Sequence, residues 1–287
     1  MFRICILIPY FGKWPFWMPF FLESCRRNPD IDWKFFSDCD RLENVPPNVH
    51  IAAMSFGDYC DFISRQLDIR FVPTKPYKLC DIRSAFGHIH AADLQGYDFW
   101  GFGDVDVVYG QLRAWFTPER LARYDLLSSH TRRVSGHLTL IRNTPQMCQL
   151  FRRIPNWQER FCGPHQSMDE KAFSRIFIKR KNFPRPLFKF ANWFNPWWRK
   201  SDFREAYSTP NGKIPWVDGS YDFPCHWYWR EGHLTNDKDG DREFPYLHFI
   251  TYKKKWEKNP VQLDEDYSRI VRSGAWQVSA EGFSAFA

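Results

Sequence analysis

Two aspartates separated by one residue, Asp104 and Asp106, lie between two apolar and aromatic segments, 99–102 and 107–109. Side chains two residues apart in a strand point to the same face, so the two carboxylates are expected to share one face. Such a pair at a strand end suits a hard divalent cation, which takes oxygen ligands and often keeps a phosphate as another. A solvated turn is the alternative, but the buried character of both flanks favours a metal–phosphate site.

The elements expected to position this pair alternate between strand and helix, which predicts an α/β fold. Residues 4–8 form a continuous apolar run that is typical of a buried parallel strand. Further strands are expected at 31–36, 49–53, 125–129, 137–142 and 244–251, and helices at 14–26, 58–67, 75–94 and 144–153. The last 30 residues are expected to form a helix and a loose tail.

Ligands of open α/β sheets bind at the carboxyl ends of the strands. This rule points to the loop Pro9–Lys13, which follows the first expected strand, and to Asp38, which follows the second. An ordinary tight turn is the alternative for both.

Composition restricts the class of protein. The chain has 287 residues, enough for one large α/β domain, and 40 Lys and Arg against 33 Asp and Glu favour an anionic partner. None of the eight cysteines forms a CxxC pair, which argues against a zinc centre and favours reduced thiols in the cytoplasm. The apolar N-terminal run stops at Pro9 and is too short for a signal peptide. The sequence contains no run of 18 apolar residues, so no membrane span is expected.

Residues 179–200 combine seven cationic side chains with seven Phe or Trp and contain no acidic residue. Their prolines argue against one regular helix. This composition suits an interfacial segment on an anionic leaflet, and we expect peripheral contact with a membrane there. An acceptor-binding lid is a competing interpretation. Single-stranded nucleic acid ranks last, because no nucleic-acid-binding signature accompanies the segment, and no nucleic-acid partner is expected.

Taken in order, the motifs Phe102-Gly103-Asp104-Val105-Asp106, Met168-Asp169-Glu170 and His248 resemble those of GT-A-type nucleotide-sugar glycosyltransferases. The resemblance extends over residues 4–256 and is strongest to the family 8 and family 32 branch and to a bacterial group of surface-polysaccharide biosynthesis. It implies a GT-A-like, Rossmann-type mixed sheet flanked by helices, with a smaller C-terminal acceptor subdomain. Residues 1–154 would bind the nucleotide-sugar, and 155–287 the acceptor and the membrane.

The resemblance implies a metal site. Asp104, Asp106 and His248 would hold Mn²⁺ or Mg²⁺ against the diphosphate of the donor, with Asp106 as the firmer ligand and Asp104 also near the ribose. A histidine satisfied within a half-buried strand is the alternative for His248. The family has a glycine between this histidine and a phosphate-binding lysine. That glycine is missing here, so Lys253, Lys254 and Lys255 all remain candidates, against a merely solvated face.

Other donor contacts are implied on the nucleotide side. Pro9, Tyr10 and Phe11 would bind the base and ribose, with Tyr10 or Phe11 stacked on a uracil and Asp38 accepting from its ring N–H. Lys78 and Asp81, three apart on an expected helix, would approach the nucleotide or donor sugar. For neighbouring Arg83 an exposed ion pair is the favoured interpretation.

On the acceptor side, Gly136 and His137 would line the donor sugar, with His137 bonding to its hydroxyls. Asp169 and Glu170 would be the catalytic carboxylates near the acceptor, one of them serving as general base if the enzyme inverts. Acidic residues that complement a helix dipole are the alternative.

The resulting hypothesis is a metal-dependent glycosyltransferase, a hexosyltransferase-like enzyme of class EC 2.4. It would move a sugar from a nucleotide-sugar, expected to be UDP-linked, to a bacterial surface-polysaccharide or lipid-linked acceptor at the cytoplasmic membrane face. A sugar-phosphate nucleotidyltransferase is disfavoured, because the loop 9–13 is a poor phosphate-binding loop. A non-enzymatic, basic-aromatic module that binds glycans or membranes is the remaining alternative.

Overall fold

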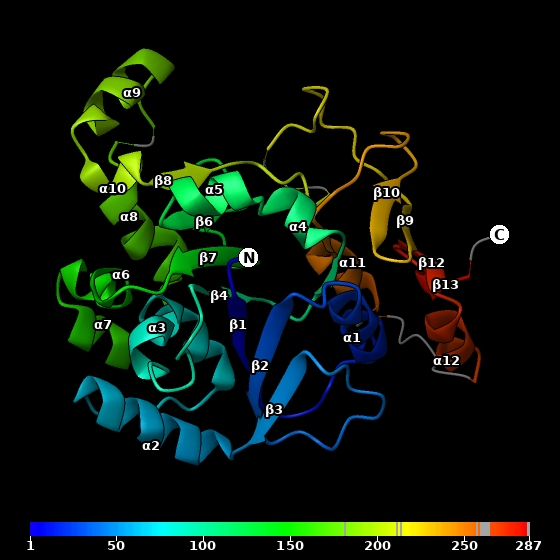
Figure 1. The fold of residues 1–287 in the computed structure, drawn as a ribbon, viewed down its shortest axis with the longest axis horizontal. Helices are drawn as coiled ribbons and strands as arrows, with labels where there is room; N and C mark the ends of the chain where they lie inside the picture. The colour runs from blue at the N-terminus through cyan, green and yellow to red at the C-terminus, as the bar shows by residue number, and fades with distance from the viewer. Residues whose placement is uncertain (181, 211, 213, 257, 259–264, 286–287) are drawn as a thin grey trace.

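A seven-stranded mixed sheet forms the centre of the molecule, with strand order β3-β2-β1-β4-β7-β6-β8 (Figure 1). The computed structural model describes residues 1–180, 182–210, 212, 214–256, 258 and 265–285. The parallel part comprises β1 (Ile4–Pro9), β2 (Ile31–Ser37), β3 (Val49–Ala53) and β4 (Phe99–Gly103). β7 (Leu138–Arg142) runs antiparallel to β4, and the sheet continues through β6 (Leu126–Ser128) to β8 (Ser201–Phe203).

Helices cover both faces of this sheet and form two hydrophobic cores with it. One core packs Ile63, Phe86 and Phe151 against the sheet, and the other packs Phe21 and Leu121. The first face carries α2 (Phe56–Leu67), the 3₁₀ helix η1 (Pro76–Ala85), α3 (Phe86–Ile89), α6 (Pro145–Cys148), η2 (Leu150–Arg153) and α7 (Trp157–Cys162). The second carries α1 (Met18–Arg26), α4 (Leu112–Trp115) and α5 (Pro118–Arg123). A mixed α/β sheet flanked by helices is therefore confirmed.

Two smaller sheets complete the fold, and the four-stranded one lies near α1 in Figure 1. One has strand order β10-β9-β12-β13, with β9 (Trp227–Arg230), β10 (His233–Asn236), β12 (Ala275–Ser279) and β13 (Gly282–Ser284). The other pairs β5 (Val107–Tyr109) with β11 (Tyr246–His248). Phe20 of α1 stacks on Phe283 with ring centroids 4.0 Å apart, within an aromatic core shared with α11 (Ile250–Trp256) and α12 (Glu265–Arg272). Strands from before and after residue 154 thus share sheets. The division into a nucleotide-sugar-binding part, 1–154, and an acceptor-binding part, 155–287, stays a prediction.

A helical arm leaves the large sheet before β8. It begins with the π-helix η3 (Asp169–Phe173) and continues through α8 (Ser174–Phe177), α9 (Arg185–Trp193) and α10 (Pro196–Arg199), at the upper left of Figure 1. Throughout the described part of the chain, every helix is too short or too polar to cross a membrane.

Three local expectations are wrong. The expected helix 75–94 is the 3₁₀ helix η1 followed by the short α3. The expected strand 244–251 is limited to β11, because the lysine-bearing segment after it forms α11. The loose tail is the hairpin β12–β13, which pairs with β9 through contacts between Trp276 and Trp229 that no local pattern reveals.

The packing between β5 and β11, the strand that carries His248, can be tested by a substitution at Gly110. Its N–H donates to the carbonyl of Pro245 at 2.9 Å, and a Cβ at this position would overlap the backbone oxygen of Phe244. Gly110→Ala is expected to lower the free energy of unfolding by about 2–3 kcal/mol, because backbone cannot move aside as a side chain can. The control Gly57→Ala lies at an exposed position of α2, where the nearest atom is 3.8 Å away, and should stabilise the protein by about 0.5 kcal/mol. Urea unfolding measures both, and equal effects would contradict the prediction.

Candidate functional site

A cavity of about 860 Å³ opens where β1 and β4 end. Its size is that of a pocket for a small-molecule or cofactor ligand. Segments distant in sequence line it, among them the loop after β1, the bend after β4 and the start of η3. The cavity lies where the strand-end rule places ligands in open α/β sheets.

The two aspartates of the central motif lie on a bend, not within a strand. β4 ends at Gly103 and β5 begins at Val107, so the expected strand alternation of Asp104 and Asp106 is wrong. Backbone contacts hold the bend: the indole of Trp17 donates to the carbonyl of Val105 at 2.9 Å, and the N–H of Phe249 donates to that of Asp106 at 3.2 Å. The carboxylates are therefore held at the cavity by groups from α1 and the C-terminal part.

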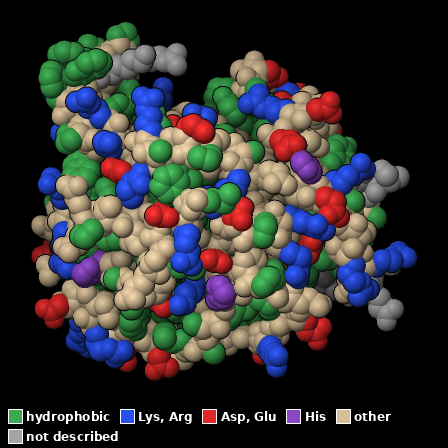
Figure 2. All heavy atoms as spheres, viewed as in Figure 1, with side chains coloured by type: hydrophobic (Ala, Val, Ile, Leu, Met, Phe, Trp, Pro, Cys, Tyr) green, Lys and Arg blue, Asp and Glu red, His purple; other side chains and the backbone are tan. Residues whose placement is uncertain are grey.

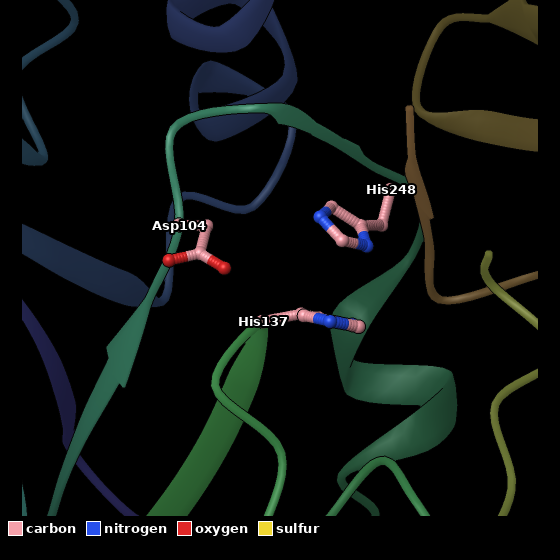
Figure 3. Close-up of side chains that lie close together, drawn as sticks. All are labelled: Asp104, His137 and His248. Atoms are coloured by element: carbon pink, nitrogen blue, oxygen red, sulfur yellow. The ribbon is translucent and has the colours of Figure 1, made fainter. Parts of the chain in front are cut away.

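One carboxylate and two imidazoles converge in the cavity (Figure 3). The ligand atoms of Asp104, His137 and His248 all lie within 4.8 Å of one another. His137 directly precedes β7, which pairs with β4, and His248 ends β11, which pairs with β5. Sheet pairing therefore brings together three residues that lie far apart in the sequence.

Asp106 lies at the edge of this cluster. One carboxylate oxygen is 3.6 Å from Nε2 of His248, and the other accepts from the ammonium of Lys253 at 3.0 Å. The side chain is 9% exposed, and burial, together with the nearby charge of Asp104, raises the pKa of Asp106 above its ordinary value. A buried carboxylate with a raised pKa, paired with one ammonium group, is typical of a functional site.

Burial keeps both imidazoles neutral. It lowers the pKa of His137 to about 3, with the neighbouring His248 contributing, and the pKa of His248 to about 4. The hydroxyl of Thr209 lies 3.1 Å from Nδ1 of His248 and orients the ring, leaving Nε2 on the side of Asp106. Neutral imidazoles with an outer-shell partner are the form that binds metals. Together with two carboxylates they fit Mn²⁺ better than Mg²⁺, which prefers an all-oxygen shell.

Arg83 connects Asp104 of the cluster with Asp169 of η3. It lies 2.5 Å from Asp104 and 3.6 Å from Asp169, and it donates to the carbonyl of Gly136 at 3.0 Å. Its side chain is only 13% exposed, so the favoured interpretation of Arg83 as an exposed ion pair is wrong. Burial alone would raise the pKa of Asp104, but the charge and the hydrogen bond of Arg83 outweigh it and hold that pKa below its ordinary value.

Asp169 and Glu170, at the start of η3, also line the cavity. Asp169 is almost fully buried, and burial raises its pKa to about 7 against the lowering effect of Arg83. Glu170 is paired with Arg133 at 3.1 Å. Both acids line the cavity together with Gly136, so the structure places the predicted catalytic pair in the same cavity as Asp104, His137 and His248.

Lys78 and Asp81 are buried beside the cavity and bind protein groups. Lys78 donates to Asp81 at 2.8 Å and to the carbonyls of Arg160 and Pro164. Asp81 also accepts from the backbone N–H groups of Gln166 and Met168. These contacts hold the loop that leads into Asp169. The structure therefore places Lys78 and Asp81 where they support the wall of the cavity.

The loop after β1 reaches the cavity through Pro9, Tyr10 and Phe11. Tyr10 stacks on Trp14 with ring centroids 5.2 Å apart. Asp38 does not line the cavity; it accepts from the N–H of Gly12 at 2.8 Å and so holds the loop in place.

Among the candidate lysines, Lys253 lines the cavity and Lys254 is exposed outside it. The helical turn of α11 separates them, because neighbouring residues of a helix point about 100° apart. Sequence reasoning missed Arg83 and Thr209 and gave His137 a different role. The position of Arg83 beside Lys78 and Asp81 was the only local signal.

The sequence profile of a family of unknown function, DUF6625, matches residues 6–277. The chain belongs to DUF6625. No functionally curated protein matches the sequence of this DUF6625 member.

Solved structures with a similar arrangement to this DUF6625 chain include three glycosyltransferases. An active-site mutant of LgtC is 10% identical, over 94% of this chain and 96% of its own, with a TM-score of 0.45. An enzyme involved in glycosylating the major capsid of PBCV-1 is 11% identical, over 90% and 98%, with a TM-score of 0.45. Mouse xyloside xylosyltransferase 1 is 7% identical, over 77% and 90%, with a TM-score of 0.36. At these values, function must be argued from the residues of the site.

Proposed function

We propose that this protein is a metal-dependent glycosyltransferase that uses a nucleotide-sugar, with UDP as the carrier. The convergence of Asp104, His137 and His248 beside Asp106 and Lys253 supports this most directly. Carboxylates and imidazoles can hold a divalent cation, and the cation and a neighbouring lysine can together bind a diphosphate. Their place near the strand ends of an α/β sheet is where such ligands bind. The order of motifs that resembles GT-A-type enzymes supports the same proposal.

One group of residues would bind the diphosphate leaving group, and another would bind the acceptor. Asp104, Asp106, His137 and His248 would hold Mn²⁺, which supplies charge neutralisation for the diphosphate leaving group. Lys253 adds a second positive charge on that side, and Arg83 keeps the two groups of carboxylates at a fixed separation. The loop 9–11 offers Tyr10 to the base.

Asp169 and Glu170 line the cavity, where they would face the acceptor hydroxyl. We place the acceptor in the class of surface-polysaccharide or lipid-linked glycans, and the enzyme at the cytoplasmic face of the membrane. The composition of residues 179–200 supports this placement.

The proposal is tested by thermal unfolding with UDP, Mn²⁺ or both. Saturation about 100-fold above the Kd stabilises a protein by about 2.7 kcal/mol, so UDP with Mn²⁺ should raise the Tm by about 5 °C and UDP alone by much less. GDP in place of UDP tests the base. The absence of any Mn²⁺-dependent shift with either nucleotide would overturn the proposal and favour a non-enzymatic module. Sugar release from UDP-sugars then separates a glycosyltransferase from a nucleotidyltransferase.

Lys253 and Lys254 provide a matched pair of variants for the same assay. Lys253→Ala is expected to weaken UDP binding about 10- to 100-fold, because it removes a charge-assisted contact from the cavity. Lys254→Ala should leave the affinity within about two-fold, since an exposed lysine contributes little. Titration calorimetry measures both, and equal losses would mean that α11 contributes only diffuse charge.

The pKa of Asp169 predicts a pH dependence. Because its pKa is raised to about 7, the carboxyl is protonated below that pH and ionised above it. If the ionised form is the base, the rate of sugar transfer should rise from pH 6 to 8 and then level off. Asp169→Asn is expected to abolish this rise and to lower the rate about 100- to 10,000-fold, whereas Glu170→Gln should keep the rise. A wild-type rate that falls over this range would exclude Asp169 as the base.

A further inference from the structure

We propose that the outward face of α9 inserts into an anionic membrane surface. Leu187, Phe190, Trp193 and Phe194 are 54%, 71%, 69% and 79% exposed. In the part of the chain that the structure describes, eleven large hydrophobic residues are exposed, and five of them fall within residues 183–194. Figure 2 shows hydrophobic side chains gathered over the arm that contains α9, at the upper left. Such a concentration is unusual for a surface that faces only water.

The arm is anchored through its other face, so the exposure is built into the fold. The buried amide of Asn192 donates to the carbonyls of Lys179 and Phe188, each at 2.9 Å. Phe188 packs edge-on against Trp198, which stacks on Phe203 of β8. The aromatic residues of the segment therefore divide into an inward anchor and an outward face, and α9 presents the outward face as one stripe because 187, 190 and 194 are three and four residues apart.

The charges around the stripe identify its occupant. Residues 179–200 hold seven Lys and Arg and no acid, and Lys179, Arg180, Arg199 and Lys200 are exposed. Within this range, Lys181 and the side chains of Arg185 and Lys189 lie outside the described residues. Apolar side chains flanked by cations match the interface of an anionic leaflet. A second copy of the chain would instead bring two cationic segments together, which is unfavourable.

The arm is also tied to the wall of the cavity. Asn195 donates to the carbonyls of Ile176 and Phe177 of α8, at 2.9 and 2.8 Å. α8 continues directly from η3, which carries Asp169 and Glu170. Insertion of α9 would therefore hold the acceptor-side wall at the membrane. This last step rests on the proposed function, whereas membrane insertion itself does not.

Co-sedimentation with vesicles tests the inference. The double variant Phe190→Ser/Trp193→Ser is compared with a control, Val72→Ser/Tyr221→Ser, which removes equally exposed side chains elsewhere, 63% and 66% exposed. Wild type and control are expected to bind vesicles of mixed phosphatidylglycerol and phosphatidylcholine, and the arm variant to bind about ten-fold or more weakly. Binding to pure phosphatidylcholine should be much weaker.

Two outcomes would overturn the inference. One is equal binding, or no binding, by wild type and the arm variant. The other is a wild-type dimer in sedimentation velocity that the arm variant abolishes, since a second copy would then cover the stripe. Mn²⁺-dependent UDP binding, measured on the same variants, should be unchanged. If wild type binds vesicles but not UDP, the membrane inference holds and the proposed function fails.

Discussion

Asp106→Asn is expected to lower Mn²⁺-dependent sugar release from UDP-sugars about a thousand-fold. The carboxylate of Asp106 lies 3.0 Å from the ammonium of Lys253 and 3.6 Å from Nε2 of His248, so it supplies negative charge beside both groups. The substitution keeps the shape of the side chain and removes that charge. Loss of one preorganised electrostatic contact in a buried site typically costs about 100- to 1,000-fold in rate, and a metal ligand belongs at the upper end.

The control is Asp98→Asn, at the opposite end of the chain segment that forms β4. Asp98 is exposed and accepts from the N–H of Arg3 at 2.8 Å, a contact that an asparagine oxygen can also make. Sugar release by this control should stay within about two-fold of wild type, and urea unfolding should show both variants folded. An Asp106→Asn enzyme with normal Mn²⁺ dependence would show that the metal site does not include this residue.

The large sheet could be predicted from sequence because its strands carry local signals. Residues 4–8 are a continuous apolar run, and 49–53 contain two β-branched residues, Val49 and Ile51. The structure has strands at Ile4–Pro9 and Val49–Ala53. The hairpin of β12 and β13 gave no comparable signal. Its stability comes from partners such as Trp229, which is 47 residues away from Trp276 in the sequence and stacks on it with ring centroids 3.7 Å apart.

The candidate site was predictable where one motif carries it. Asp104 and Asp106 line the cavity, and their binding of a metal stays a prediction. Their geometry was not predicted, because a bend and a strand share the same three-residue pattern. The partners of the pair come from pairing between distant strands. Arg83 looked like a surface residue because it shares an expected helix with the charged residues Lys78 and Asp81. Only the fold shows that its guanidinium reaches Asp104.

The role of His137 is the sharpest difference between sequence and structure. The resemblance implies contact with sugar hydroxyls. In the structure, the ring centroids of His137 and His248 are 3.7 Å apart, and His137 belongs to the cluster with Asp104. Sequence reasoning could not find this, because β7 brings His137 to the site only by pairing with β4.

His137→Ala is therefore expected to weaken Mn²⁺ binding about 100-fold or more, as strongly as His248→Ala. Both rings are neutral at pH 7 because burial lowers their pKa values, to about 3 and 4, so each offers a lone pair without first losing a proton. Removing one of a few protein ligands costs more than removing an outer-shell partner, which typically costs 10- to 100-fold. Mn²⁺ affinity is measured directly by electron paramagnetic resonance, in the absence of nucleotide.

His165→Ala is the comparison variant, because His165 lines the same cavity but lies outside the cluster, beside Tyr77. Its Mn²⁺ affinity should equal that of wild type. If His137 instead contacts the donor sugar, His137→Ala would raise the KM for the UDP-sugar and leave Mn²⁺ affinity unchanged. The two measurements therefore separate a ligand of the metal from a residue that recognises the sugar, and a metal-binding role for His137 requires the first to change.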